Sequence, residues 1–161
     1  MRHFILTIAL ISMNIITMAQ NLRPAGYVLT DETCEMLCVA AKEKSKEMGL
    51  DISFAIADAD GLPRLFRRFG DALVLSATLV PNKAYTSAVT QSSTEELGSF
   101  VGEGGNLMYM NTCDRRLTLV PGGLPLFVDG KIVGAIGVGG GSKEQDLEIA
   151  DYVMSVFQNH P

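Results

Sequence analysis

The stretch LVPGGLPLFVDGKIVGAIGVGGGSKEQDLEIA (residues 119–150) decides the fold of this chain. Two apolar runs flank Asp129-Gly130, a dipeptide that is typical of a tight hairpin turn. The second run ends in three glycines, after which Ser142 and Gln145 stand at the spacing of a capping box. The stretch therefore predicts an antiparallel hairpin whose second strand leads directly into a helix.

The glycine triplet Gly139-Gly140-Gly141 has two interpretations. A glycine-rich segment that opens a helix leaves backbone N–H groups free to bind an anion or a cofactor carboxylate. Alternatively, the glycines only form a close strand-to-helix turn in which no side chain fits. Gly122 and Gly123, before the first strand, are open to a similar choice between close backbone approach and a bulge. The spacing matches neither the P-loop nor the dinucleotide-binding pattern.

The rest of the chain predicts an α+β fold. Apolar periodicity and capping residues predict a first helix, a hairpin around Asp60-Gly61, further helices and a glycine-rich loop before the last hairpin. Strands in antiparallel pairs, separated by helices, favour one antiparallel sheet with helices packed against it. The predicted ranges are helices over 30–48, 72–89 and 94–101, a hairpin over 52–69 and a loop over 102–116.

The first nineteen residues differ from the rest. Arg2 precedes an apolar run over residues 4–18, and the small residue Ala19 stands before Gln20. This is the layout of a secretory signal peptide that is cleaved after Ala19, and the alternative is a buried N-terminal element of the domain. The run is too short and too interrupted for a stable membrane span. With a signal peptide the protein is periplasmic or secreted, and without one it is cytoplasmic. The expected organisation is a signal peptide at 1–19, a lead-in segment at 20–29 and one domain at 30–158.

The charge of the chain argues against a nucleic-acid partner. The 161 residues carry a formal net charge of −5, and no stripe of lysine and arginine is present that could neutralise a phosphate backbone. The nearest basic cluster, Arg64, Arg67 and Arg68, falls on the edge of a predicted strand. We interpret it as a solvated face.

Few residues are suited to nucleophilic or metal chemistry. The only histidines are His3 and His160, so a catalytic triad, a histidine-rich metal site and a conventional axial haem histidine are all poorly supported. Cys34 and Cys38 lie four residues apart on the first predicted helix, a spacing at which disulfide geometry is poor. Three cysteines make no disulfide framework, and we expect small buried side chains. No catalytic residue and no metal ligand are assigned.

Three charged residues are candidates for ligand contact. Lys83 lies on a helical face of small residues, where it could reach a carboxylate or extend to solvent. Asp58 flanks a turn, where aspartate is common for local hydrogen bonding alone. Asp146 lies in the first turn of the last helix, where the helix dipole explains it without a ligand. In an enzyme these three residues would be the acid/base groups.

Several segments resemble the GlcG/HbpS-like family, also called the haem-degrading domain, which includes the C-terminal domain of PduO-type proteins. The matching segments are, in order, FAIADADGLPRLFRRF, NKAYTSA, PGGLPLFVDGKIVGAIGVGGG and KEQDLEIA, within residues 30–158. The resemblance implies a profilin- or PAS-like fold with a five-stranded antiparallel sheet flanked by helices. It also implies a homo-oligomer, a tetramer or octamer, and haem or a related tetrapyrrole or corrinoid as ligand.

The resemblance also implies which residues contact the ligand. Lys83 is the expected contact for a propionate, and the glycines allow close backbone approach. Some PduO-type members hold the haem iron through a histidine in the first helix, where this chain offers only Cys34, Met36 and Cys38. The candidate ligand-binding residues are Asp58, Lys83, Gly122, Gly123, Gly139, Gly140, Gly141, Gln145 and Asp146.

Three functions follow from these observations. The first is an exported, oligomeric binding protein for haem or a related tetrapyrrole. The second is an enzyme that acts on a small carboxylate metabolite, with Lys83, Asp58 and Asp146 in one pocket. The third is an accessory subunit, of the kind found in glycolate or diol utilisation, whose glycines serve only packing.

Overall fold

The computed structural model describes residues 29–101, 105, 107 and 109–160. The predicted signal peptide and residues 20–28 of the lead-in lie outside this part of the chain. The order of elements is the predicted one: helix, hairpin, helices, hairpin, helix. The elements are α2 (Asp31–Glu47), β1 (Ser53–Asp58), β2 (Pro63–Arg68), α3 (Ser76–Thr90), α4 (Thr94–Val101), the 3-10 turn η1 (Met110–Thr112), β3 (Gly123–Val128), β4 (Lys131–Gly139) and α5 (Lys143–Asn159).

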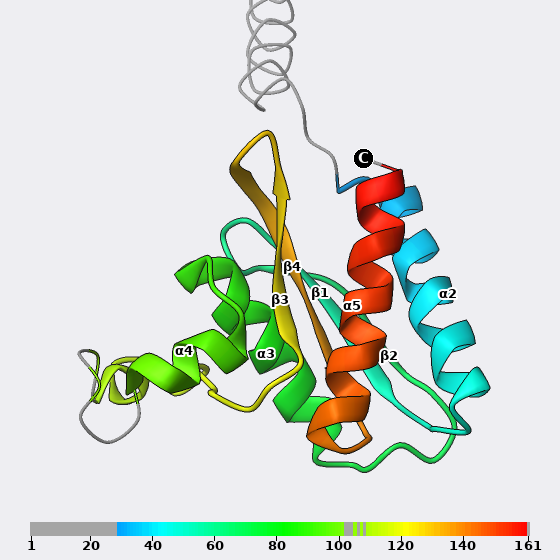
Figure 1. Ribbon diagram of the computed structural model, residues 1–161, viewed down its shortest axis with the longest axis horizontal. Coiled ribbons are helices and arrows are strands. Elements are labelled where there is room, and N and C mark those ends of the chain that lie inside the picture. Colours follow the sequence, from blue (N-terminus) through cyan, green and yellow to red (C-terminus); the bar gives the residue numbers. More distant parts are fainter. Residues whose placement is uncertain (1–28, 102–104, 106, 108, 161) are drawn as a thin grey trace, which may run out of the picture.

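The strands form one antiparallel sheet in the order β2-β1-β4-β3 (Figure 1). The α+β class is confirmed, but the expected five-stranded sheet is wrong, because the described residues form four strands. The remaining apolar stretch, residues 117–120, does not add a strand. The Thr118 N–H instead donates to Thr86 Oγ1 on α3, at 3.0 Å.

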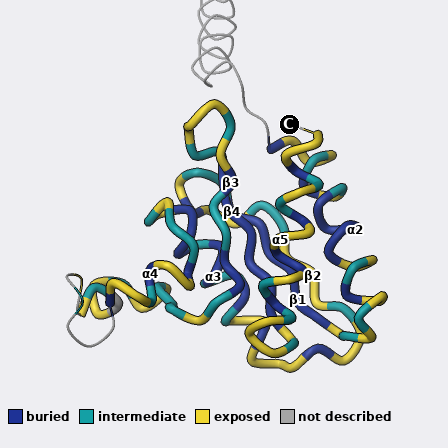
Figure 2. The backbone as a smooth tube through the Cα atoms, viewed as in Figure 1, coloured by how far each residue is buried: buried dark blue, intermediate teal, exposed yellow. Residues whose placement is uncertain are grey.

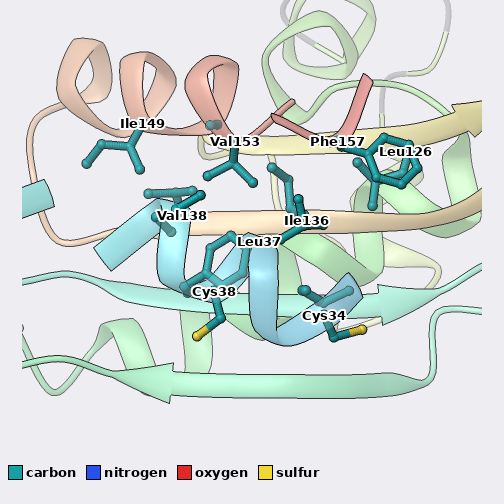
Figure 3. Packing of buried hydrophobic residues seen from close by; sticks show 14 of the residues in the cluster. Cys34, Leu37, Cys38, Leu126, Ile136, Val138, Ile149, Val153 and Phe157 are labelled. Atoms are coloured by element: carbon teal, nitrogen blue, oxygen red, sulfur yellow. The ribbon is translucent and has the colours of Figure 1, made fainter. Parts of the chain in front are cut away.

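Helices α2 and α5 lie side by side and cover one face of the sheet (Figure 1). The central strands β1 and β4 are buried along most of their length, as Figure 2 shows. Cys34 and Cys38 of α2 belong to this core, and Figure 3 shows them on the side away from the labelled side chains of α5. The prediction of small buried cysteines is confirmed for this pair and is wrong for Cys113, which is exposed. The largest fully buried apolar side chains of this core are Leu29, Leu37, Ile52, Phe54, Ile56, Leu126, Ile136, Val138, Ile149 and Phe157.

Helix α3 covers the other face through very small side chains. Ala55 and Ala57 of β1 and Ala135 of β4 pack there against Val80, Ala84 and Ala88 of α3. At Gly137 of β4 the backbone of α3 packs directly against the strand. The approach is so close that a Cβ added at Gly137 would collide with the Val80 carbonyl oxygen. Gly137 and Gly139, two positions apart on β4, therefore serve close packing against α3, whereas Gly134 faces Leu29 and the backbone of β1.

The predicted turns and caps are present. Asp129 and Gly130 have φ values of 50° and 72°, the left-handed pair expected of a tight hairpin turn. Ser142 and Gln145 form the predicted capping box of α5. Helix α3 begins at Ser76 instead of residue 72, and it continues through Pro81.

The basic edge of the sheet is tied to the neighbouring helix. Arg64 pairs with Asp31 at 2.9 Å and Arg67 pairs with Glu35 at 3.0 Å, both acids lying on α2. This agrees with a solvated face. Within the described part of the chain, no helix is long and apolar enough to cross a membrane.

Replacing Gly137 by Ala should destabilise the protein. The new methyl group meets backbone atoms of Val80 and Ala84, so we expect a loss of about 1–3 kcal/mol in the free energy of unfolding. Urea denaturation measures it as a lower midpoint at unchanged slope. Gly98→Ala in α4 is the control, because the nearest atom to its added Cβ lies 3.6 Å away. Equal stability of the two variants would contradict the packing argument.

Candidate functional site

A cavity of about 200 Å³ opens where the start of α3, the end of β4 and the start of α5 meet. We call it the Lys83 cavity. Its floor is polar and its rim is largely apolar. The lining residues are Leu73, Leu75, Ser76, Leu79, Lys83, Val120, Pro121, Gly139, Gly140, Gly141, Lys143 and Asp146.

The floor of the cavity is a buried ion pair. Lys83 Nζ lies 2.9 Å from Asp146 Oδ2 and donates a second hydrogen bond to the Val138 carbonyl oxygen at 2.6 Å. Lys83 and Asp146 are 0% and 5% exposed, so water does little to solvate either charge. The pair joins α3, β4 and α5 at one point. Both members of the pair must therefore be present, since removing one of them leaves the other charge buried without a counter-charge.

The carboxylate of Asp146 is held from a second side. The Gly141 N–H donates to Asp146 Oδ1 at 3.0 Å, and the backbone amide of Gly140 also helps to lower the pKa of this carboxyl. Burial raises the pKa of the Asp146 carboxyl, whereas Lys83 and the two glycine amides act in the opposite direction. The anion that occupies these amides is thus a side chain of the protein itself.

The glycines around the pair leave room for it. At Gly122, with φ of 111°, an added Cβ would lie 2.9 Å from Lys83 Nζ and 2.7 Å from the Val138 oxygen. At Gly139 it would press on Val80 and lie 3.4 Å from the same nitrogen. Close packing around the ion pair is enough to explain why glycine stands at these positions. Their role as ligand contacts stays a prediction.

Most of the candidate ligand-binding residues converge on this cavity. Gln145 lies next to it and caps α5, with its Oε1 accepting from the Ser142 N–H at 2.8 Å. Gly123 lies on the far side of Lys83, where its N–H donates to Thr94 Oγ1 at 3.0 Å.

Asp58 is separate from the others. It pairs with Gly134 on β4, whereas the cavity end of β4, Gly139, pairs with Ser53 at the opposite end of β1. Asp58 Oδ1 instead accepts from the backbone N–H groups of Asp60 and Leu62, at 3.0 and 2.8 Å, as expected of a turn aspartate. The predicted acid/base set of Lys83, Asp58 and Asp146 is therefore not assembled in one pocket.

The apolar rim was not predicted from the sequence. Leu73, Leu75 and Val120 are 66%, 63% and 45% exposed. The signal was available in Leu73-Val74-Leu75, three consecutive apolar residues in a connection between elements, where polar residues are usual.

The candidate iron ligands of α2 do not face the Lys83 cavity. Cys34 and Cys38 belong to the core between the sheet and the helices, and Met36 packs against it. Burial raises the pKa of the Cys34 thiol to about 11 and also raises that of Cys38. Because the thiolate is the metal ligand, both cysteines are poor ligands here. The described residues contain no cluster of three His, Cys, Asp or Glu side chains that could hold a metal ion.

Comparison with known families identifies the chain. Residues 29–155 match the family described as haem degrading protein HbpS-like. The chain therefore belongs to the HbpS-like family, which confirms the resemblance seen in the sequence.

Two related sequences and one solved structure resemble this chain over most of its length. A 15.0 kDa protein of the dhaT-dhaS intergenic region of Citrobacter freundii is 32% identical over 80% of this chain and 92% of its own length. Corrinoid adenosyltransferase PduO of the same organism is 32% identical over 84% of this chain but only 41% of its own length. A solved structure of a PduOC:heme complex is 31% identical, with a TM-score of 0.76 over 79% of this chain and 93% of that chain.

Replacing Lys83 by Met should destabilise the protein by about 3–5 kcal/mol, because the Asp146 carboxylate stays buried without its cation. In a double-mutant cycle, the added Asp146→Asn change should restore part of the loss, and urea denaturation of the four proteins measures the coupling. Arg67→Gln, which removes an exposed ion pair with Glu35, is the control and should change little. Strictly additive losses for the Lys83 and Asp146 changes would contradict the argument.

Proposed function

We propose that this chain binds haem or a related tetrapyrrole, including a corrinoid, as a homo-oligomer. The observation that carries the proposal is the exposed apolar rim above the polar floor of the Lys83 cavity. A tetrapyrrole has the same division into a flat apolar ring and carboxylate arms. The similarity to the PduOC:heme complex supports this class of ligand.

The size of the cavity determines how such a ligand can lie. At about 200 Å³ it is smaller than the roughly 300–1,000 Å³ of pockets that enclose drug-sized ligands. It accommodates one edge of the ring with its carboxylate, while the remainder of the ring lies across Leu73, Leu75 and Val120. These side chains need a cover, and a second copy of the chain supplies it in a tetramer or octamer.

Two lysines are suited to the ligand carboxylates. Lys143 lies at the rim with its side chain about half exposed, paired with Glu95 at 2.7 Å. Lys83 Nζ bonds Asp146 and Val138, which leaves one of its three N–H groups. In this proposal Lys143 is the first contact and Lys83 the second.

The residues that line the Lys83 cavity suit the ring and the carboxylates of a tetrapyrrole. Helix α2 offers no suitable ligand for its iron. The cysteines of α2 are buried in the core with raised pKa values, and no histidine is present in that helix. We therefore derive no step through the iron. Haemin and metal-free protoporphyrin IX are expected to bind with similar affinity.

Titration of the full chain with haemin and with protoporphyrin IX tests this proposal. We expect saturable absorption changes for both, with affinities within about tenfold, since 1.4 kcal/mol corresponds to that factor. Leu75→Asp should weaken both by about tenfold or more, because it places a charge on the apolar rim. Leu62→Asp, an equally exposed leucine outside the cavity, is the matched control.

A response that does not saturate would contradict tetrapyrrole binding. The size of the cavity favours a second candidate in that case, a small carboxylate metabolite such as glycolate. Saturable binding of glycolate that depends on Lys143, without binding of either porphyrin, would support this candidate. Because Asp58 is separate from Lys83 and Asp146, the geometry favours binding or an accessory role over acid/base catalysis.

We also propose that the protein is exported, on the strength of the signal-peptide pattern in residues 1–19. Expression of the full gene in a bacterial host should yield a periplasmic or secreted protein whose first residue is Gln20. N-terminal sequencing of the fractions measures this. A cytoplasmic protein that retains Arg2 would contradict export.

A further inference from the structure

A second cavity, of about 180 Å³, lies on the other flank of α3, between this helix and the edge strand β2. We call it the Tyr85 pocket. It shares no lining residue with the Lys83 cavity. Nothing in the proposed function uses it, and the inference below is independent of that proposal.

The pocket exists because small residues meet an uncovered strand. Ala55, Ala57 and Ala84 form its floor and leave space between α3 and the sheet. Phe66 of β2 pairs with Ala55 in register, so it stands on the same face and forms a wall. Its 40% exposure shows that α3 does not close this side. The result is an open slot with one aromatic wall on the sheet.

Tyr85 forms the opposite wall and is fixed in three ways. The Arg116 guanidinium lies 3.9 Å from the centre of its ring. Its hydroxyl donates to Asp114 Oδ2 at 2.8 Å. The β1–β2 turn presses on the ring edge, where a Cβ on Gly61 would lie 2.7 Å from Cδ2. A wall held in this way loses little conformational freedom when a ligand binds.

The lining of the pocket also carries hydrogen-bond donors that the described residues do not use. Arg116 donates to Asp114 through Nε and Nη2, at 3.1 and 2.6 Å, which leaves its Nη1. The side-chain amide of Asn82 makes no hydrogen bond within the described part of the chain. A guanidinium is well suited to a carboxylate oxygen. The donors therefore favour a ligand with an acceptor at one end of an apolar body.

We propose that the Tyr85 pocket binds a monocyclic aromatic carboxylate. An apolar cavity of about 150 Å³ is known to hold benzene, so 180 Å³ accommodates one ring with a small substituent and excludes a tetrapyrrole. The ring lies between Phe66 and Tyr85, where aromatic pairs add to apolar burial. The carboxylate lies against Arg116 Nη1 and the Asn82 amide.

Titration of the ¹⁵N-labelled full chain with benzoate, followed by NMR, tests the proposal. We expect saturable amide shifts centred on Ala55, Ala57 and Tyr85, with a Kd on the order of 1 mM for so small a ligand. Phe66→Ala and Arg116→Gln should each weaken binding by about tenfold, because one removes a wall and the other the carboxylate donors.

The chain provides matched controls for both variants. Phe127 on β3 is 41% exposed and lies outside the pocket, so Phe127→Ala should leave benzoate affinity unchanged. Arg115→Gln is the control for the neighbouring arginine. Well-dispersed amide spectra establish that each variant folds. If either Phe66→Ala or Arg116→Gln fails to fold, the other variant still tests the pocket.

Four results would overturn the proposal. One is benzoate shifts that centre on the Lys83 cavity or never saturate. Another is wild-type affinity in both Phe66→Ala and Arg116→Gln. Equal affinity for benzyl alcohol would remove the carboxylate from the assignment, and equal affinity for acetate would remove the ring.

Discussion

The ion pair between Lys83 and Asp146 is the interaction on which the arrangement of this domain depends. It connects the helix on one face of the sheet to a helix on the other face, at the end of β4. Two buried charges are costly unless hydrogen bonds compensate them, and here backbone groups of Val138 and Gly141 add to the bond between the two side chains. The surrounding glycines follow from the same requirement, since a side chain at Gly122 would displace the ammonium group.

This pair also defines what the Lys83 cavity offers. Its charges are largely balanced within the protein, so the floor contributes one lysine hydrogen and no net charge. In the proposed function, selectivity for the ligand therefore rests on the apolar rim and on Lys143. Such a site is better suited to orienting an amphipathic ligand than to moving protons. The position of Asp58 at the far end of β1 supports the same conclusion.

Local features of the fold could be predicted from the sequence, and long-range ones could not. The hairpin at Asp129-Gly130 and the capping box of α5 depend on residues a few positions apart, and both are present. The partnership of Lys83 with Asp146 spans 63 positions and leaves no periodic trace. The fifth strand came from family resemblance alone, and the 117–120 segment bonds α3 instead. The glycine-rich end of β4 is evident in the sequence, but only the packed structure shows that Gly137 and Gly139 lie against α3.

Both outer strands of the sheet carry a proline, Pro63 in β2 and Pro125 in β3. A proline cannot donate to a neighbouring strand, and the arginines of β2 add like charge along that edge. The edge strands of two copies of the chain therefore pair poorly with each other. The homo-oligomer proposed above is therefore expected to form through side-chain surfaces, and the same edge features oppose the strand-by-strand growth that leads to fibrils.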